Sequence, residues 1–172
     1  ALMFYLDFIL TSFTDLKPDE STHFIPFLFD KKTSNSPGSF SLVFFAPDFS
    51  DETKLVKYEY FISLNESEVF KESLFYSPKG QKELVFERKI DMPVKWGSTI
   101  TGAKKIVSEA TRPNCSLIGA GAQVNHPVFS SIYKYFSTRV QPIIMPAHDG
   151  ISDFILKKIE KDNKKMFKFS ER

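Results

Sequence analysis

The stretch 55–64 alternates between apolar and polar residues more regularly than any other part of the sequence, and it constrains the fold most. One face of this stretch, in an extended chain, would carry Val56, Tyr58, Tyr60, Ile62 and Leu64. The opposite face would carry Leu55, Lys57, Glu59, Phe61 and Ser63. Such a pattern predicts an antiparallel strand with one face covered by the protein core and the other largely in contact with water.

Several neighbouring segments predict further strands that are separated by short turns. Apolar runs at 24–29, 40–45, 69–76 and 84–88 alternate with polar or proline- and glycine-containing connections at 31–39, 65–67 and 77–80. Leu84 and Phe86 are expected on the same face of their strand. Because sequential strands usually pair, residues 24–90 are expected to form an antiparallel meander.

Helical patterns flank this predicted sheet. Residues 1–14 form the first expected helix, in which Leu2, Leu6, Ile9 and Phe13 are three or four residues apart. No Ser, Thr, Asp or Asn precedes this helix to cap its first N–H groups, so upstream residues are expected to be missing. Because most of its side chains are apolar, the helix is expected to be covered on several sides. The fold class is therefore α+β, with an antiparallel meander flanked by helices.

The second half of the chain, 100–172, is expected to be mainly helical. Residues 102–111 predict a short helix, and 115–121 fit either a buried strand or the first part of a helix. A clearer helix begins at Pro127, with His126 as its N-cap residue. Its apolar stripe consists of Val128, Phe129, Ile132, Tyr133 and Phe136.

The rest of this half divides between linkers and one more helix. Trp96 is placed in a linker that it anchors by packing, 140–145 is a short apolar run, and a last helix is expected from Ser152. Together these elements are interpreted as one partial domain over residues 1–172.

Charge and cysteine content argue against several classes of function. With 23 basic and 21 acidic residues, the formal net charge is +2, which is too small to predict a nucleic-acid-binding or membrane-surface protein. One cysteine, Cys115, excludes a disulfide framework, and no spacing of metal ligands is present. A cytoplasmic location without membrane association is expected. The lysines between Lys157 and Lys168 predict a solvated helix face, with a phosphate-binding face as the alternative.

The order of these segments resembles a known family. The segments that carry the resemblance are FYSPKG at 75–80, LVFER at 84–88, EATRPN at 109–114 and GAGAQVNH at 119–126. Over nearly its whole length the chain resembles AAA-family ATP-binding proteins of the RecF/SMC/OLD-like branch of ABC-type ATPases. The YSPKG hairpin and the TRPN segment are the most specific pieces. Several such proteins belong to DNA-repair or phage-defence systems.

The resemblance implies where this chain would lie in a parent ATPase. The helix at Ala1 would directly follow the phosphate-binding loop, and the meander would be the β-subdomain beside the nucleotide. Gln123 would be a Q-loop-like residue that senses Mg²⁺ and the γ-phosphate, with a helix-capping or loop residue as the alternative. The chain departs from the family because it contains no G-x-x-x-x-G-K-[ST] sequence and no strand that ends in paired acidic residues. ATP and Mg²⁺ are therefore expected only in the parent protein, and the chain alone is not expected to be catalytic.

Two other functions remain open from the sequence. A stand-alone β-rich module that binds a protein partner is the main alternative, and a small enzyme built on His148 and Asp149 has little support because no nucleophile lies near them. No catalytic residue is assigned. The expected partners are the remainder of the parent ATPase and a second copy of the chain, which would bury either the first helix or a free sheet edge. Nucleic acid is expected as a partner of the parent only.

Overall fold

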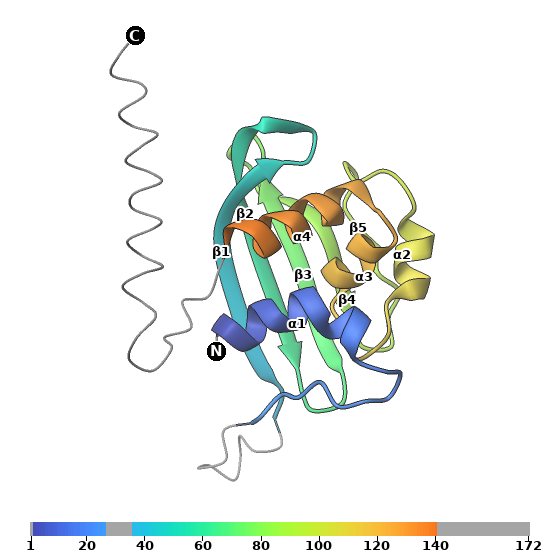
Figure 1. The fold of residues 1–172 in the computed structure, drawn as a ribbon. Helices are drawn as coiled ribbons and strands as arrows, with labels where there is room; N and C mark the ends of the chain where they lie inside the picture. Colours follow the sequence, from blue (N-terminus) through green and yellow to red (C-terminus); the bar gives the residue numbers. More distant parts are fainter. Residues whose placement is uncertain (1, 27–35, 141–172) are drawn as a thin grey trace, which may run out of the picture. The chain divides into compact units, whose positions relative to one another are not determined.

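The sheet predicted from the alternating stretch forms the centre of the fold. The computed structural model describes residues 2–26 and 36–140. Their sheet has five antiparallel strands in the order β1-β2-β3-β4-β5 (Figure 1). The strands are β1 (Gly38–Asp48), β2 (Asp51–Leu64), β3 (Val69–Ser77), β4 (Glu83–Lys89) and β5 (Lys95–Trp96). The predicted α+β fold with an antiparallel meander is confirmed.

Strand β2 shows the predicted division into two faces. Its even-numbered residues from Val56 to Leu64 are buried, whereas Lys57, Glu59 and Phe61 remain partly exposed on the opposite face. Tyr60 pairs with Leu42 of β1 on one side and with Leu74 of β3 on the other. The three strands therefore share this inner face. The alternation in the sequence thus fixes which face of the sheet receives the helices.

The described residues form four helices. They are α1 (Leu2–Asp15), α2 (Lys104–Ala110), α3 (Leu117–Gln123) and α4 (Pro127–Arg139). Figure 1 shows α1 and α4 crossing the same face of the sheet, with α3 packed near them and α2 towards the β4–β5 side. The segment 115–121, which fitted a strand or a helix, leads into α3 after Ser116, whose side chain caps the helix.

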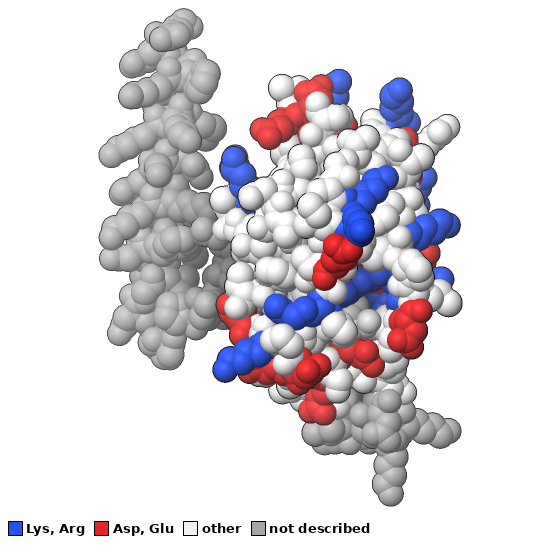
Figure 2. Space-filling view, turned by 90° about the vertical axis from the view of Figure 1, so that its right-hand side faces the viewer, with Lys and Arg blue, Asp and Glu red and all other residues white. Residues whose placement is uncertain are grey.

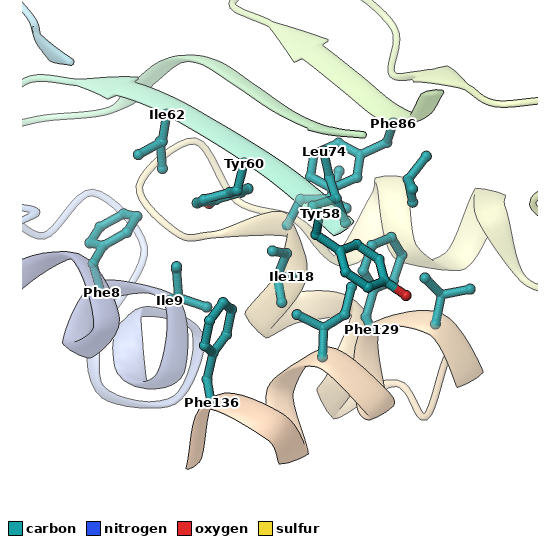
Figure 3. Close-up of a cluster of buried hydrophobic side chains, with 14 of the residues drawn as sticks. Phe8, Ile9, Tyr58, Tyr60, Ile62, Leu74, Phe86, Ile118, Phe129 and Phe136 are labelled. Carbon is teal, nitrogen blue, oxygen red and sulfur yellow. The ribbon is translucent and has the colours of Figure 1, made fainter. Parts of the chain in front are cut away.

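The core between sheet and helices is largely aromatic and aliphatic (Figure 3). Tyr60 from β2 meets Tyr5 from α1 at 5.6 Å between ring centroids, and Phe86 from β4 meets Phe129 from α4 at 5.6 Å. Both pairs are edge-to-face, an arrangement in which the positive edge of one ring meets the negative face of the other. Rings from elements far apart in the sequence therefore hold the two layers together.

Several expectations about individual elements were wrong. Phe24 to Pro26, the described part of the expected strand 24–29, is not in a strand. Trp96, expected in a linker, lies in the two-residue strand β5. An irregularity between Leu74 and Phe75 in the pairing of β3 with β4 breaks the alternation in β4, so Phe86 is buried while Leu84 is partly exposed.

Helix α1 packs against the sheet, α3 and α4. Tyr5, Leu6, Phe8 and Ile9 are buried, but Leu2 is 55% exposed and Met3 is 47% exposed. The sheet and two other helices thus contact α1, while its first two described residues remain exposed. None of the helices among these residues is long and apolar enough to cross a membrane.

Internal contacts divide the chain into Ala1–Gln141 and Pro142–Arg172. All described residues belong to the first unit. His148, Asp149, most of the 140–145 run and the expected last helix lie outside the described residues. A single partial domain over 1–172 stays a prediction.

Phe129 provides a test of the aromatic core. Phe129→Ala removes a fully buried ring that contacts Phe86, Trp96 and His126, and we expect it to lower the free energy of unfolding by about 3–5 kcal/mol. Urea denaturation followed by tryptophan fluorescence measures this change. Phe45→Ala is the matched control, because Phe45 is 59% exposed and its loss should change the stability by less than about 0.5 kcal/mol. Equal effects of the two variants would contradict the assigned core.

Candidate functional site

The strongest cluster of charged and polar side chains is centred on Glu72, which is completely buried on the inner face of β3. Its Oε1 accepts hydrogen bonds from the Tyr60 hydroxyl at 2.6 Å and the Ser116 hydroxyl at 3.1 Å. The backbone N–H of Leu117 donates to Oε2 at 3.0 Å. The carboxylate therefore lies at the start of α3, where the free N–H groups of a helix favour negative charge.

Arg88 supplies the opposite charge from the neighbouring strand β4. Glu72 and Arg88 are directly paired in the sheet, and the guanidinium Nε lies 2.8 Å from Oε2 of Glu72. Arg88 also donates to the backbone carbonyls of Arg112 and Cys115. One arginine thus neutralises the buried carboxylate and holds the 112–116 segment (RPNCS) against the sheet.

The 112–116 segment in turn fixes the end of α1. The Arg112 guanidinium donates to the carbonyls of Phe13 at 2.7 Å and Leu16 at 2.8 Å, and it lies over the Phe13 ring. These carbonyls need such a donor, because the last carbonyls of a helix have no intrahelical partner. Asn114 continues the contact by donating to the carbonyls of Lys17 and Glu20. The backbone N–H of Ser116 donates to the Ser12 hydroxyl at 3.0 Å.

This arrangement is structural. Both oxygens of Glu72 accept bonds from the protein itself, and the carboxylate has no exposed surface on which a substrate or metal could bind. Burial, with a further contribution from the nearby Glu72 charge, raises the pKa of Tyr60, so its hydroxyl stays protonated and remains a donor. The cluster therefore joins β3, β4, α1 and α3.

Gln123, the predicted Q-loop-like residue, is not part of this cluster. It is the last residue of α3, and its side chain is exposed. Because α3 begins beside Glu72, Gln123 lies roughly 10 Å away along the helix axis, at the other end. Its sensing role stays a prediction, and its exposure leaves it accessible to a group outside the described residues.

His126 is the N-cap residue of α4, but its ring does not cap the helix. The ring is 1% exposed and packs against Trp96 at 6.4 Å and Phe129 at 4.9 Å between centroids. Neither ring nitrogen completes a hydrogen bond of ordinary geometry with the described residues. Burial lowers the pKa of His126, the nearby Lys104 lowers it further, and the Thr101 carbonyl partly opposes these effects. The His126 imidazole is therefore neutral and lies within an aromatic cluster.

The remaining candidate residues offer no reactive group. Cys115 is buried, and burial raises the pKa of its thiol, so it is protonated at neutral pH. Within 2–26 and 36–140, no three His, Cys, Asp or Glu side chains lie close enough to hold a metal ion. On the face shown in Figure 2, acidic and basic side chains are interspersed. An apolar cavity of about 540 Å³ lies beside Phe4, Phe24 and Phe40.

Glu72 and Arg88 were not predicted as a pair, although the sequence contains a signal for it. In β3, Glu72 lies on the same inner face as Leu74 and Tyr76. In β4, Arg88 lies on the same inner face as Phe86. Opposite charges at inward positions of consecutive strands indicate a buried ion pair, because an unpaired buried charge is too costly. The TRPN segment was singled out, but its role in holding α1 was not predicted.

The buried ion pair can be tested with Glu72→Gln. This change removes the negative charge and leaves Arg88 buried without its partner, so we expect a loss of about 3–5 kcal/mol in the free energy of unfolding. Chemical denaturation measures the loss. Glu59→Gln is the matched control, because Glu59 pairs with Lys57 and Lys82 at the protein surface, where ion pairs contribute little. A stable Glu72→Gln protein would contradict the role given to the pair.

His126 predicts a pH dependence of stability. Its pKa is lowered in the folded protein from an ordinary value of 6.5, so below pH 6.5 the unfolded chain binds more protons than the folded one. The stability that neutral His126 contributes to the folded protein is therefore fully present above pH 6.5. It decreases as the pH falls towards the pKa of His126 in the folded protein. Thermal unfolding between pH 7.5 and 5 should show this decrease.

Two variants separate the His126 contribution from that of other groups. His126→Phe keeps an aromatic ring in the cluster and should flatten the pH dependence. His23→Asn alters an exposed histidine and should retain it. An unchanged pH dependence in His126→Phe would show that other groups cause it.

Comparisons with protein-family models, curated proteins and solved structures found no match. The interpretation of the site therefore rests on its geometry and on the residues themselves.

Proposed function

We propose that this chain is an accessory lobe of an AAA/ABC-type ATP-binding protein, and that it supplies binding surface and nucleotide sensing while other parts of the protein bind the phosphates. The observation that carries this proposal is the asymmetric anchoring of α1. Arg112 holds its C-terminal end through the carbonyls of Phe13 and Leu16, while its first turn exposes Leu2 and Met3.

This asymmetry suits a helix whose first turn meets another part of a protein. The free N–H groups at the start of a helix bind phosphate well, and a preceding phosphate-binding loop would place the phosphates there. Exposed apolar side chains at the same end are the kind of surface that a further protein segment covers. The resemblance of the chain to RecF/SMC/OLD-like ATPases supplies the identity of that segment.

The charged groups of the core support a structural role for this lobe. Glu72, Arg88 and Arg112 are engaged in holding the sheet to α1 and α3. Gln123 is exposed at the end of a helix that this network fixes in place. In the parent protein, a firmly held α3 would present Gln123 to Mg²⁺ and to the attacking water. DNA repair or phage defence is the biological setting that the resemblance suggests.

A stand-alone interaction module is the second candidate, and the edge of β1, on which no other described strand is paired, favours it. This strand is 11 residues long and lies at the end of the sheet. Such an edge can accept a strand from another protein. The two candidates differ in whether a phosphate-binding loop is encoded with this chain.

Nucleotide binding and hydrolysis distinguish these functions. Mg-ATP titrated into the 172-residue chain should give no binding heat in calorimetry, because the chain has no phosphate-binding loop. In the complete product of the encoding gene, we expect ATP hydrolysis, and Gln123→Ala should lower kcat by about 100-fold with little change in nucleotide affinity.

Gln81→Ala is the matched control, because Gln81 is an exposed glutamine in the β3–β4 turn and should leave kcat unchanged. Tight ATP binding by the chain alone would contradict the proposal. A complete gene product without ATPase activity would favour the interaction module.

A further inference from the structure

The two edges of the sheet differ in how they are protected from pairing. At one edge, β5 has two residues, one of which is Lys95, and such a short, charged strand discourages further pairing. At the other edge, β1 has 11 residues, and no charged residue occurs between Gly38 and Pro47. From Gly38 to Pro47, β1 is thus a long uncharged edge on which no described strand is paired, and such an edge can accept another strand.

The inner face of β1 is incompletely covered. Phe40, Leu42 and Phe44 point towards the helices but are only half-buried, whereas the corresponding β2 residues Tyr58, Tyr60 and Ile62 are fully buried. Phe136 of α4 packs on Phe44 at 4.8 Å, and Tyr5 of α1 packs on Phe40 at 5.1 Å. The helices therefore cover the inner face of Phe40, Leu42 and Phe44. The part of these side chains that stays exposed favours an additional strand beside β1.

The residue order of β1 fits an antiparallel copy of itself. A two-fold axis at Leu42 would pair Leu42 with its own copy and Phe40 with Phe44 of the second chain, all on the inner face. Ser41 would pair with Val43 on the outer face. No like charges meet across such a seam, because the strand carries none there. The partly exposed aromatic row would continue from one chain into the other.

We propose that two copies of this chain associate through their β1 strands, antiparallel and in register about Leu42, to form one continuous sheet. The backbone groups along the free edge gain hydrogen-bond partners, and the Phe40–Leu42–Phe44 row becomes covered from the side. This inference does not depend on ATP binding. The sequence left two surfaces open for self-association, the first helix and a sheet edge. We choose the sheet edge because α1 already packs its main apolar stripe on the sheet.

Disulfide trapping tests the register. Leu42→Cys should form a cross-linked dimer under mild oxidation, because directly opposed residues of antiparallel strands have Cα atoms about 4.5–5.5 Å apart, a separation that a disulfide spans. Ser39→Cys is the matched control in the same strand. Its two copies would lie roughly 20 Å apart in the proposed register and should not cross-link. The native Cys115 is buried and does not interfere.

Sedimentation or light scattering tests the association itself. The wild-type chain should be a dimer at micromolar concentration, and Val43→Lys should weaken association about tenfold or more by placing charges on the edge. Leu55→Lys also replaces an exposed apolar residue, 68% exposed, but it lies on β2 outside the seam and should leave the dimer intact. Circular dichroism confirms that each variant is folded.

Several outcomes would overturn the proposal. A wild-type chain that stays monomeric at about 100 µM would do so, as would a dimer that resists Val43→Lys and does not cross-link through Leu42→Cys. Cross-linking of Ser39→Cys would show another register. If β1 amides become protected from hydrogen exchange only when another part of the parent protein is added, the edge pairs with that part and not with a second copy.

Discussion

The buried ion pair between Glu72 and Arg88 is the interaction on which the rest of the fold depends. Two charges removed from water are costly unless every hydrogen-bonding group around them is satisfied. Tyr60, Ser116 and Leu117 donate hydrogen bonds to the carboxylate, while the carbonyls of Arg112 and Cys115 accept from the two terminal nitrogens of the guanidinium. The same bonds bring the start of α3 and the 112–116 segment onto the sheet, so neutralising the charges also positions the helical layer.

The position of this pair explains which surfaces remain open. The helical layer is tied to β3 and β4 through Glu72 and Arg88, and it contacts β1 through the rings of Tyr5, Phe136 and Tyr135. Strand β1 is consequently half-covered on its inner face and unpaired along its outer edge within the described residues. The first turn of α1 lies away from the network and exposes apolar side chains.

The TRPN segment, which carries part of the family resemblance, has a structural role in this chain. Arg112 and Asn114 of the TRPN segment bind the carbonyls at and after the end of α1, and Ser116 caps α3. These contacts explain why such a segment would characterise a fold, but they involve no nucleotide. The proposed ATPase function consequently rests on Gln123, on the first turn of α1 and on the resemblance itself.

The sequence by itself determined strands β1 to β4, the inner face of β2 and the helix that begins at Pro127, because these depend on local periodicity and on residues close together in the chain. It located Gln123 and the TRPN segment without showing what either contacts. Only the tertiary structure decided the rest. The irregular pairing at Leu74 and Phe75 buries Phe86 and leaves Leu84 partly exposed, and the choice of helix for α3 depends on Ser116 and Glu72, which are 44 residues apart. Local patterns cannot specify such contacts. The contacts become favourable only when groups that are distant in the sequence are buried next to each other.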